Sequence, residues 1–137
     1  MESFYIDTSI WIDLLEERKG YSGENLGSFA LQLFARIKAK GLALCLSDIL
    51  LHELARFYTI EEIRGMTMPF EKITKKILST SDQRREARRI AIERNVPLGD
   101  ALHAILARDH RLIFVTRDND FRKLQDICPS YRPEDLI

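Results

Sequence analysis

The chain opens with the sequence Ser3-Phe4-Tyr5-Ile6-Asp7-Thr8-Ser9-Ile10-Trp11-Ile12-Asp13-Leu14-Leu15, which carries the strongest indication of its fold. Residues 3–7 form a short, mostly apolar run that predicts a buried strand, and the apolar spacing from Ile10 onward predicts a helix. A strand that passes directly into a helix is typical of an α/β fold. Asp7 lies at the junction, and a carboxylate is rarely buried unless a partner offsets its charge.

The rest of the chain repeats this alternation. Further strands are predicted at residues 42–46, 73–78 and 111–115, and further helices at 26–40, 48–58, 82–95, 100–109 and 118–124. Ser47 and Ser81 are the expected N-caps of two of these helices. Between residues 59 and 76 we expect a helical turn at 61–64, with Gly65 and Pro69 breaking the pattern. We therefore expect one domain, residues 1–137, folded as a three-layer α/β sandwich with a central, mainly parallel sheet flanked by helices.

The composition is that of an ordinary globular domain, with 45% apolar and 31% charged residues among 137. Lys and Arg total 21 and Asp and Glu total 21, so any contact with nucleic acid must come from a local basic surface. The two cysteines have neither a metal-ligand spacing nor the numbers for a disulfide framework. No apolar run is long enough for a membrane span, and the first residues carry no basic signal segment. We expect a cytoplasmic protein with no membrane contact.

Four acidic residues lie in apolar surroundings, where an ionised carboxylate is unfavourable. Asp7 and Asp118 follow predicted strands, at the edge of an α/β sheet where ligands bind. Glu53 and Asp100 lie within apolar helical patterns. Phe57, one turn after Glu53, belongs to the same predicted apolar face, so we expect the carboxylates on these helices to point inward.

Like charges held close together raise each other's pKa and destabilise the fold unless a cation neutralises them. Mg²⁺ or Mn²⁺ prefers oxygen ligands and retains some waters, which leaves positions for a phosphate and a nucleophile. Taken singly, each acid also has a structural explanation as a helix cap, as a residue favoured by a helix dipole or as the partner of a buried arginine. Their joint placement favours a shared divalent cation and the hydrolysis of phosphodiesters.

The order of these segments resembles that of the PIN-domain ribonucleases, and most closely the VapC-type toxins of toxin–antitoxin modules. The resemblance covers nearly the whole chain. It rests on Tyr5-Ile6-Asp7-Thr8-Ser9-Ile10-Trp11-Ile12-Asp13-Leu14-Leu15, Ser47-Asp48-Ile49-Leu50-Leu51-His52-Glu53-Leu54, Leu98-Gly99-Asp100-Ala101-Leu102-His103-Ala104 and Val115-Thr116-Arg117-Asp118-Asn119-Asp120-Phe121. The first and third segments are the specific ones. One departure is a somewhat long loop at residues 18–27, at the entrance to the expected site.

The resemblance implies a PIN-like fold, a single-stranded RNA substrate, Mg²⁺ or Mn²⁺ as cofactor, a homodimer, and a small antitoxin protein that blocks the site. It also implies a set of functional residues. The metal ligands would be Asp7, Glu53, Asp100 and Asp118, with Asp120 as a further candidate for the fourth position. The hydroxyl residues near the metal's waters would be Thr8, Ser9 and Thr116.

Other features allow two interpretations each. Four arginines on the helix at 82–95 form either a solvated surface or a contact for RNA phosphates, with Arg84 and Arg88 as the candidates at the site. Arg117 is either a phosphate ligand or a member of an ion pair. His103 is either a half-buried structural histidine or a residue that supports the metal ligands. Large apolar residues in the first two helices form either core or a dimer interface, namely Trp11, Leu14, Leu15, Phe29 and Phe34. We expect a two-fold symmetric homodimer.

The favoured function is therefore a metal-dependent endoribonuclease that acts as a toxin and leaves a 5′-phosphate. One alternative is a PIN nuclease that processes RNA without any antitoxin, and another is an inactive PIN-like module that binds RNA or protein. A third is a phosphatase in which Asp7 is the nucleophile. Asp7-Thr8-Ser9 lacks the second aspartate expected of such an enzyme, which argues against the phosphatase.

Overall fold

A parallel β-sheet forms the centre of the computed structural model, which describes residues 2–137. Its five strands lie in the order β3-β2-β1-β4-β5, and each pairing is parallel. The strands are β1 (Ser3–Ile6), β2 (Ala43–Ser47), β3 (Thr74–Ile77), β4 (Ile113–Val115) and β5 (Ser130–Tyr131). Short strands joined by long connections favour this topology, because parallel neighbours cannot be linked by a tight hairpin.

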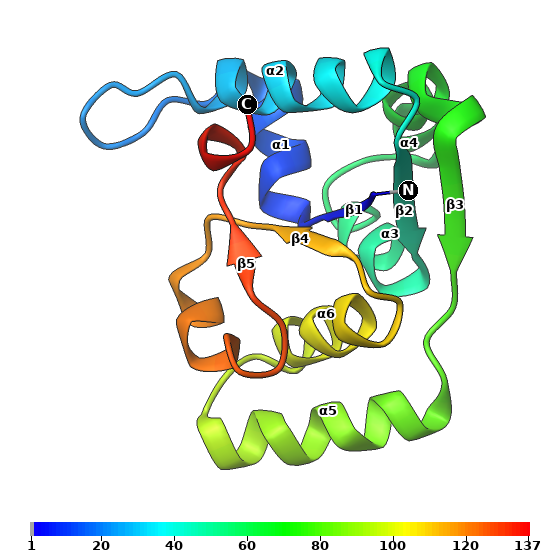
Figure 1. The fold of residues 1–137 in the computed structure, drawn as a ribbon, viewed down its shortest axis with the longest axis vertical. Helices are drawn as coiled ribbons and strands as arrows, with labels where there is room; N and C mark the ends of the chain where they lie inside the picture. The colour runs from blue at the N-terminus through cyan, green and yellow to red at the C-terminus, as the bar shows by residue number, and fades with distance from the viewer. Residues whose placement is uncertain (1) are drawn as a thin grey trace.

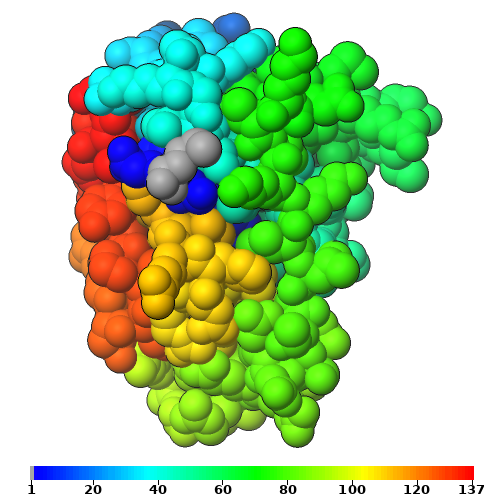
Figure 2. Space-filling model, turned by 45° about the vertical axis from the view of Figure 1, so that its right-hand side comes forward, coloured from blue at the N-terminus to red at the C-terminus, as the bar shows by residue number. Residues whose placement is uncertain are grey.

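Helices supply the connections and cover the sheet. They are α1 (Thr8–Glu16), α2 (Leu26–Ala39), α3 (Asp48–Leu54), α4 (Ile60–Thr67), α5 (Ser81–Arg94) and α6 (Leu98–Asp109), with 3₁₀ turns η1 (Met68–Ile73), η2 (Asn119–Leu124) and η3 (Pro133–Asp135). Helices α1 and α2 lie on one side of the sheet and α5 and α6 on the other (Figure 1). In the space-filling view α5 forms one end of the molecule, next to α6 (Figure 2). The predicted α/β architecture with a sheet flanked by helices is confirmed.

The order of the strands determines where a site can form. The chain builds β1, β2 and β3 outward in one direction and then returns to place β4 on the other side of β1. The crevice at the carboxyl ends of the strands, where the strand order reverses, is the usual ligand site of open α/β sheets. Here that crevice lies between β1 and β4, which pair with Ile6 opposite Val115.

The core lies on both sides of β1, where Tyr5 and Ile6 are fully buried. On α6 the small residues Ala101, Ala104 and Ala107 are completely buried, so the helix packs closely on its surroundings. No helix among the described residues has the length and apolarity to cross a membrane.

Of the large apolar residues considered for a dimer interface, Trp11 and Phe34 belong to the core. Trp11 is fully buried and Phe34 is 1% exposed, and their rings pack edge to face with centroids 4.6 Å apart inside the core. They are core residues because α1 and α2 pack against each other through them.

The expected helix at 48–58 is too long. Helix α3 ends at Leu54, and Phe57 is 66% exposed and not on a buried face. A new helix, α4, begins directly after Thr59, whose hydroxyl accepts a hydrogen bond from the Glu62 amide while the Glu62 carboxylate accepts one from the Thr59 amide. This reciprocal cap starts a helix that passes through Gly65, so the predicted break there is also wrong.

Three smaller features also differ from expectation, namely two helix boundaries and one strand. Thr80, not Ser81, caps α5, because the Thr80 hydroxyl accepts from the Gln83 amide at 3.1 Å. Helix α6 begins at Leu98, two residues before Asp100. Strand β5 was not predicted: it is only two residues long, and it pairs with the edge of β4.

Candidate metal centre

Asp7 is the N-cap of α1 and directly follows β1 in the crevice. Its Oδ1 accepts a hydrogen bond from the Thr8 amide at 2.9 Å. Its Oδ2 accepts one from the Ser9 hydroxyl at 3.0 Å and one from the Thr116 hydroxyl at 2.8 Å. Burial raises the pKa of this carboxyl, against the opposing effects of His103 and the hydroxyl donors. The carboxylate is therefore fixed in orientation but costly to ionise.

Glu53 reaches the same crevice from α3. Its Oε1 accepts a hydrogen bond from the Thr8 hydroxyl at 3.0 Å and pairs with Nε2 of His103. Burial acts to raise the Glu53 pKa, but the hydrogen bonds from His103 and Thr8 together with the charges of His103 and Arg56 outweigh it and the pKa is lowered. Thr8 thus links two acids, since its amide binds Asp7 and its hydroxyl binds Glu53.

The first turn of α6 lies directly against Glu53. A Cβ placed on Gly99 would lie 3.0 Å from Oε2 of Glu53, closer than most side-chain contacts. Glycine at this position lets the start of α6 pack closely on the glutamate. A side chain there would require the Glu53 carboxylate to shift by a few tenths of an ångström.

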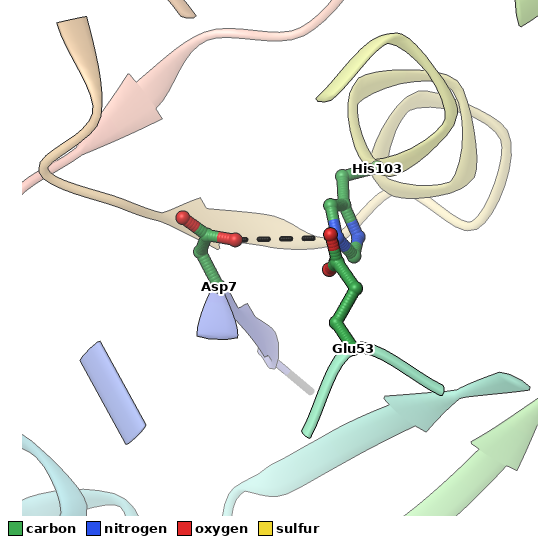
Figure 3. Close-up of side chains that lie close together, drawn as sticks. All are labelled: Asp7, Glu53 and His103. Carbon is green, nitrogen blue, oxygen red and sulfur yellow. Dashed lines mark hydrogen bonds and ion pairs between the residues drawn. The ribbon is translucent and has the colours of Figure 1, made fainter. Parts of the chain in front are cut away.

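His103 is fully buried and uses both ring nitrogens. Its Nδ1 lies 2.6 Å from the Tyr5 hydroxyl, which in turn lies 2.5 Å from the hydroxyl of Ser47, the N-cap of α3. Burial acts to lower the pKa of His103, but the bond with Glu53 and the charges of Asp7, Glu53 and Asp100 together outweigh it and raise the pKa. Figure 3 shows Asp7 and Glu53 pointing toward the imidazole, whose Nε2 lies 4.0 Å from Oδ1 of Asp7.

A second group of acids adjoins the first. Asp100, Asp118 and Asp120 can each place a carboxylate oxygen within 4.8 Å of the others. Asp118 also caps η2, because its Oδ1 accepts from the Asp120 amide at 2.9 Å. Burial, followed by the charges of Asp118 and Asp7, raises the pKa of Asp100 to about 7. Oδ2 of Asp100 is buried and has no hydrogen-bond partner.

The sequence agrees with a known family over most of its length. A family model described as PIN domain matches residues 4–127. The chain belongs to the PIN domain family. Members of this family are nucleases that use divalent metal ions, so membership supports a nuclease. No curated protein matches the chain.

Three solved structures are similar to this PIN domain over nearly its whole length. A toxin–antitoxin complex from Klebsiella pneumoniae is 23% identical, with a TM-score of 0.66 over 95% of this chain and 97% of that one. A VapBC2 complex from Rickettsia felis bound to a promoter DNA fragment is 14% identical, with a TM-score of 0.67 over 95% and 98%. A protein from Pyrobaculum aerophilum is 18% identical, with a TM-score of 0.61 over 98% and 92%. At this identity the likeness establishes the fold.

The carboxylates of this PIN domain fit a divalent cation. The predicted acids fall into two adjoining groups, with Asp7 and Glu53 beside His103 in one and Asp100, Asp118 and Asp120 in the other. Both ring nitrogens of His103 are already hydrogen-bonded, which leaves the carboxylates as the donors. The orphaned oxygen of Asp100 is the strongest sign, because a buried acceptor without a partner is costly and a cation would satisfy it. The remaining donors are hard oxygens, which suit Mg²⁺ or Mn²⁺.

The predicted supporting residues are divided between the site and its surroundings. Thr8, Ser9 and Thr116 all donate to the carboxylates, as described above. Arg117 instead pairs with both oxygens of Glu134 at 2.6 and 2.8 Å, and its Nε lies 3.6 Å from Oδ2 of the buried Asp13. The structure therefore places Arg117 in the ion-pair arrangement, joining the C-terminal η3 to α1.

Two buried polar residues at or beside the site were missed by sequence reasoning. Tyr5 was treated only as part of an apolar strand. A buried tyrosine hydroxyl usually has a hydrogen-bond partner, so a tyrosine in a buried strand next to Asp7 could have been predicted to bond within the site. Asp13 lies 4% exposed within an apolar helix, the same pattern that singled out Glu53. The link between Tyr5 and His103 had no signal, because 98 residues separate the pair.

Proposed function

We propose that this PIN domain is a Mg²⁺- or Mn²⁺-dependent endoribonuclease that cleaves single-stranded RNA and leaves a 5′-phosphate. The observation that carries the proposal is the buried, partnerless Oδ2 of Asp100 within a cluster of acids at the carboxyl edge of the sheet. Family membership supports nuclease chemistry. A bound divalent cation supplies an activated water and offsets negative charge on the phosphoryl group.

The residues that would hold the cation are Asp7, Glu53, Asp100 and Asp118, with Asp120 beside them. Ser9 and Thr116 hold the Asp7 carboxylate in one orientation, and His103 holds that of Glu53. Such supporting hydrogen bonds fix ligand geometry before substrate arrives, which reduces reorganisation during the reaction. Burial of Asp7 and His103 keeps bulk water from competing with those bonds.

The biological role we propose is that of a toxin controlled by a small antitoxin protein in the cytoplasm. The support is that the similar solved structures from Klebsiella pneumoniae and Rickettsia felis are toxin–antitoxin assemblies. We also propose a two-fold symmetric homodimer, the commonest soluble assembly. Light scattering at micromolar concentration tests it: the expected mass is twice the 16.0 kDa of one chain, and a monomer mass rejects it.

The central experiment measures cleavage of single-stranded RNA under metal control. EDTA should abolish cleavage and Mg²⁺ or Mn²⁺ should restore it, whereas Zn²⁺ should restore little because the ligands are hard oxygens. Asp7→Asn should be inactive with either metal while keeping its fold by circular dichroism. Cleavage that survives thorough chelation, or that Asp7→Asn retains, would sink the proposal.

A further inference from the structure

A groove of about 620 Å³ opens beside the acids, between α3, α5 and the start of α6. Glu53 and Asp100 line it together with Gly99, so it is continuous with the candidate metal centre. Its volume is within the range of ordinary ligand sites, roughly 300–1,000 Å³. Any chain bound at the carboxylates can extend along this groove.

Positive side chains from separate elements meet in the groove. Arg56 follows α3, and Arg84 and Arg88 lie one turn apart on α5. Since the chain carries no net charge, this concentration of arginines is a local feature of one surface. A groove with metal-binding acids and free guanidinium groups is suited to a polyanion that is also held by a cation.

The arginines of α5 differ in what they already bind. Arg85 pairs with Asp82 at 2.6 Å and Arg89 with Glu93 at 3.5 Å, each with an acid of its own helix. Arg84 and Arg88 form no ion pair in the part of the chain that the structure describes, and Arg84 donates only to the carbonyl and hydroxyl oxygens of Ser79. The two arginines that line the groove are thus the ones whose charge is not neutralised.

Arg56, like Arg88, forms no ion pair among the described residues. Its side chain makes neither an ion pair nor a hydrogen bond within residues 2–137, although Glu53 lies three positions earlier in the same groove. An arginine that stays free beside a carboxylate is available for a second anion. Guanidinium groups bind phosphates with two parallel hydrogen bonds, which makes them suited to this task.

The groove has little aromatic surface for stacking bases. The residues that line it include no Phe, Tyr or Trp, His52 supplies the one ring, and the apolar wall is formed by Ile49, Leu98 and Leu102. Proteins that bind single strands through their bases use several aromatic side chains for stacking. Contact with the charged backbone is therefore the interaction to which this surface is best suited.

We propose that this groove binds the sugar–phosphate backbone of single-stranded RNA, with Arg56, Arg84 and Arg88 contacting phosphates next to the one held at the acids. The proposal rests on the proposed nuclease function and names the path of its substrate. Because the contacts are to phosphates, binding here depends little on base identity. Sequence preference in cleavage then arises outside this groove.

The test measures RNA binding as a function of salt concentration. Asp7→Asn serves as background so that the RNA stays intact, and the probe is a fluorescein-labelled oligo(U) 12-mer followed by anisotropy between 50 and 300 mM NaCl. The logarithm of the binding constant falls with the logarithm of the salt concentration, and each lost phosphate contact on a single strand should reduce the steepness of this fall by about 0.7. Arg56→Ala with Arg88→Ala should therefore lower it by about 1.4. Arg56→Lys with Arg88→Lys should restore part of the slope, because the charge returns.

The matched control is Arg85→Ala with Arg89→Ala, which removes the same charge from exposed residues and is expected to leave the slope nearly unchanged. An equal fall in both double variants would overturn the proposal, since it would reflect net charge alone. So would an unchanged slope in the groove variant, or a loss seen with oligo(U) and not with oligo(A). Failure of the proposed function is distinguishable from failure of the groove proposal. If wild-type protein binds RNA with the expected salt dependence but does not cleave it with Mn²⁺, the groove proposal stands and the nuclease function is rejected.

Discussion

The hydroxyl of Thr116 donates a 2.8 Å hydrogen bond to Oδ2 of Asp7, although 109 residues separate the two in the sequence. The register of β1 against β4 makes this contact, because Ile6 lies opposite Val115 and the next residue of each strand enters the crevice. The Asp7 amide also donates to the Val115 carbonyl at 2.9 Å. The first strand and the fourth strand therefore form one end of the site together.

Replacing Thr116 by valine should impair the site without unfolding the protein. The change keeps the shape of the side chain and removes one of the two hydroxyl donors to Oδ2 of Asp7. Losing a group that orients a metal ligand typically lowers metal affinity or activity by about 10–100-fold. Mn²⁺ binding by calorimetry and RNA cleavage should both fall. Thr67→Val, which removes a hydroxyl bonded to the Ile63 carbonyl in α4, should leave both unchanged.

Asp100→Asn should make the metal-free protein less sensitive to pH. The pKa of Asp100 is raised from 3.8 to about 7 in the folded protein, so between these values the folded state binds more protons than the unfolded state. The free energy of unfolding must then fall as pH rises through this window. The loss should be on the order of 2 kcal/mol, because solvent screens a partly buried carboxylate.

Thermal unfolding in EDTA at pH 5 and pH 8 checks this dependence. Wild type should lose stability across the interval and Asp100→Asn should lose less. Asp82→Asn, which removes an exposed acid from α5, should follow wild type. Identical pH profiles for Asp100→Asn and wild type would mean that Asp100 contributes no proton linkage.

Gly99→Ala should reduce cleavage by displacing Glu53. The new Cβ would lie 3.0 Å from Oε2 of Glu53, and that carboxylate is held on its other oxygen by Thr8 and His103, so it must turn away from its bonds. A misplaced ligand of this kind can lower the rate by about 100-fold. Single-turnover cleavage with saturating Mn²⁺ measures the effect.

Gly65→Ala is the matched control for that change. Gly65 lies within α4 and nothing lies within 4 Å of an added Cβ. Alanine there should leave cleavage unchanged and stabilise the fold by roughly 0.5–1 kcal/mol, since glycine is unfavourable in a helix. If Gly99→Ala also kept full activity, close packing at Gly99 would have no functional role.

Tyr5→Phe should weaken metal binding through His103. The Tyr5 hydroxyl joins His103 to Ser47, and its removal leaves a buried ring nitrogen without a partner at a cost of about 1–3 kcal/mol. That cost should appear as a lower free energy of unfolding. A loosened imidazole no longer holds Glu53 in place, so the dissociation constant for Mn²⁺ should rise too. Tyr58→Phe, which removes a hydroxyl bonded to the exposed Glu16, should change neither the free energy of unfolding nor the dissociation constant.

Sequence reasoning identified what depends on local pattern and missed what depends on distant partners. Apolar runs identified β1 and β4, and the acids after them, because burial and strand ends leave a periodic signal. The reciprocal cap of Thr59 and Glu62 was also a local signal, and overlooking it extended α3 through Phe57. Strand β5 left no signal, because two residues cannot show a period and the strand exists only by pairing with β4.

The same distinction applies within the site. The acids could be predicted because each interrupts an apolar pattern, whereas their division into two groups depends on how α3 and α6 meet. Whether Trp11 and Phe34 lie in the core or in an interface was left open, because a sequence does not specify whether an apolar residue faces a neighbouring helix or another chain. His103 was recognised as a candidate, but its role depends on contacts with Tyr5 and Glu53 from two other elements.

The pairing of β1 with β4 also has a consequence for synthesis. Asp7 is translated well before Thr116 and Asp118. A sheet built entirely from parallel pairs has no local hairpin to fold early, and such long-range topologies fold slowly. The acids therefore cannot all meet until the chain has been made as far as Asp118. A nascent chain that has not yet reached β4 carries Asp7 without Thr116, a residue that fixes its carboxylate.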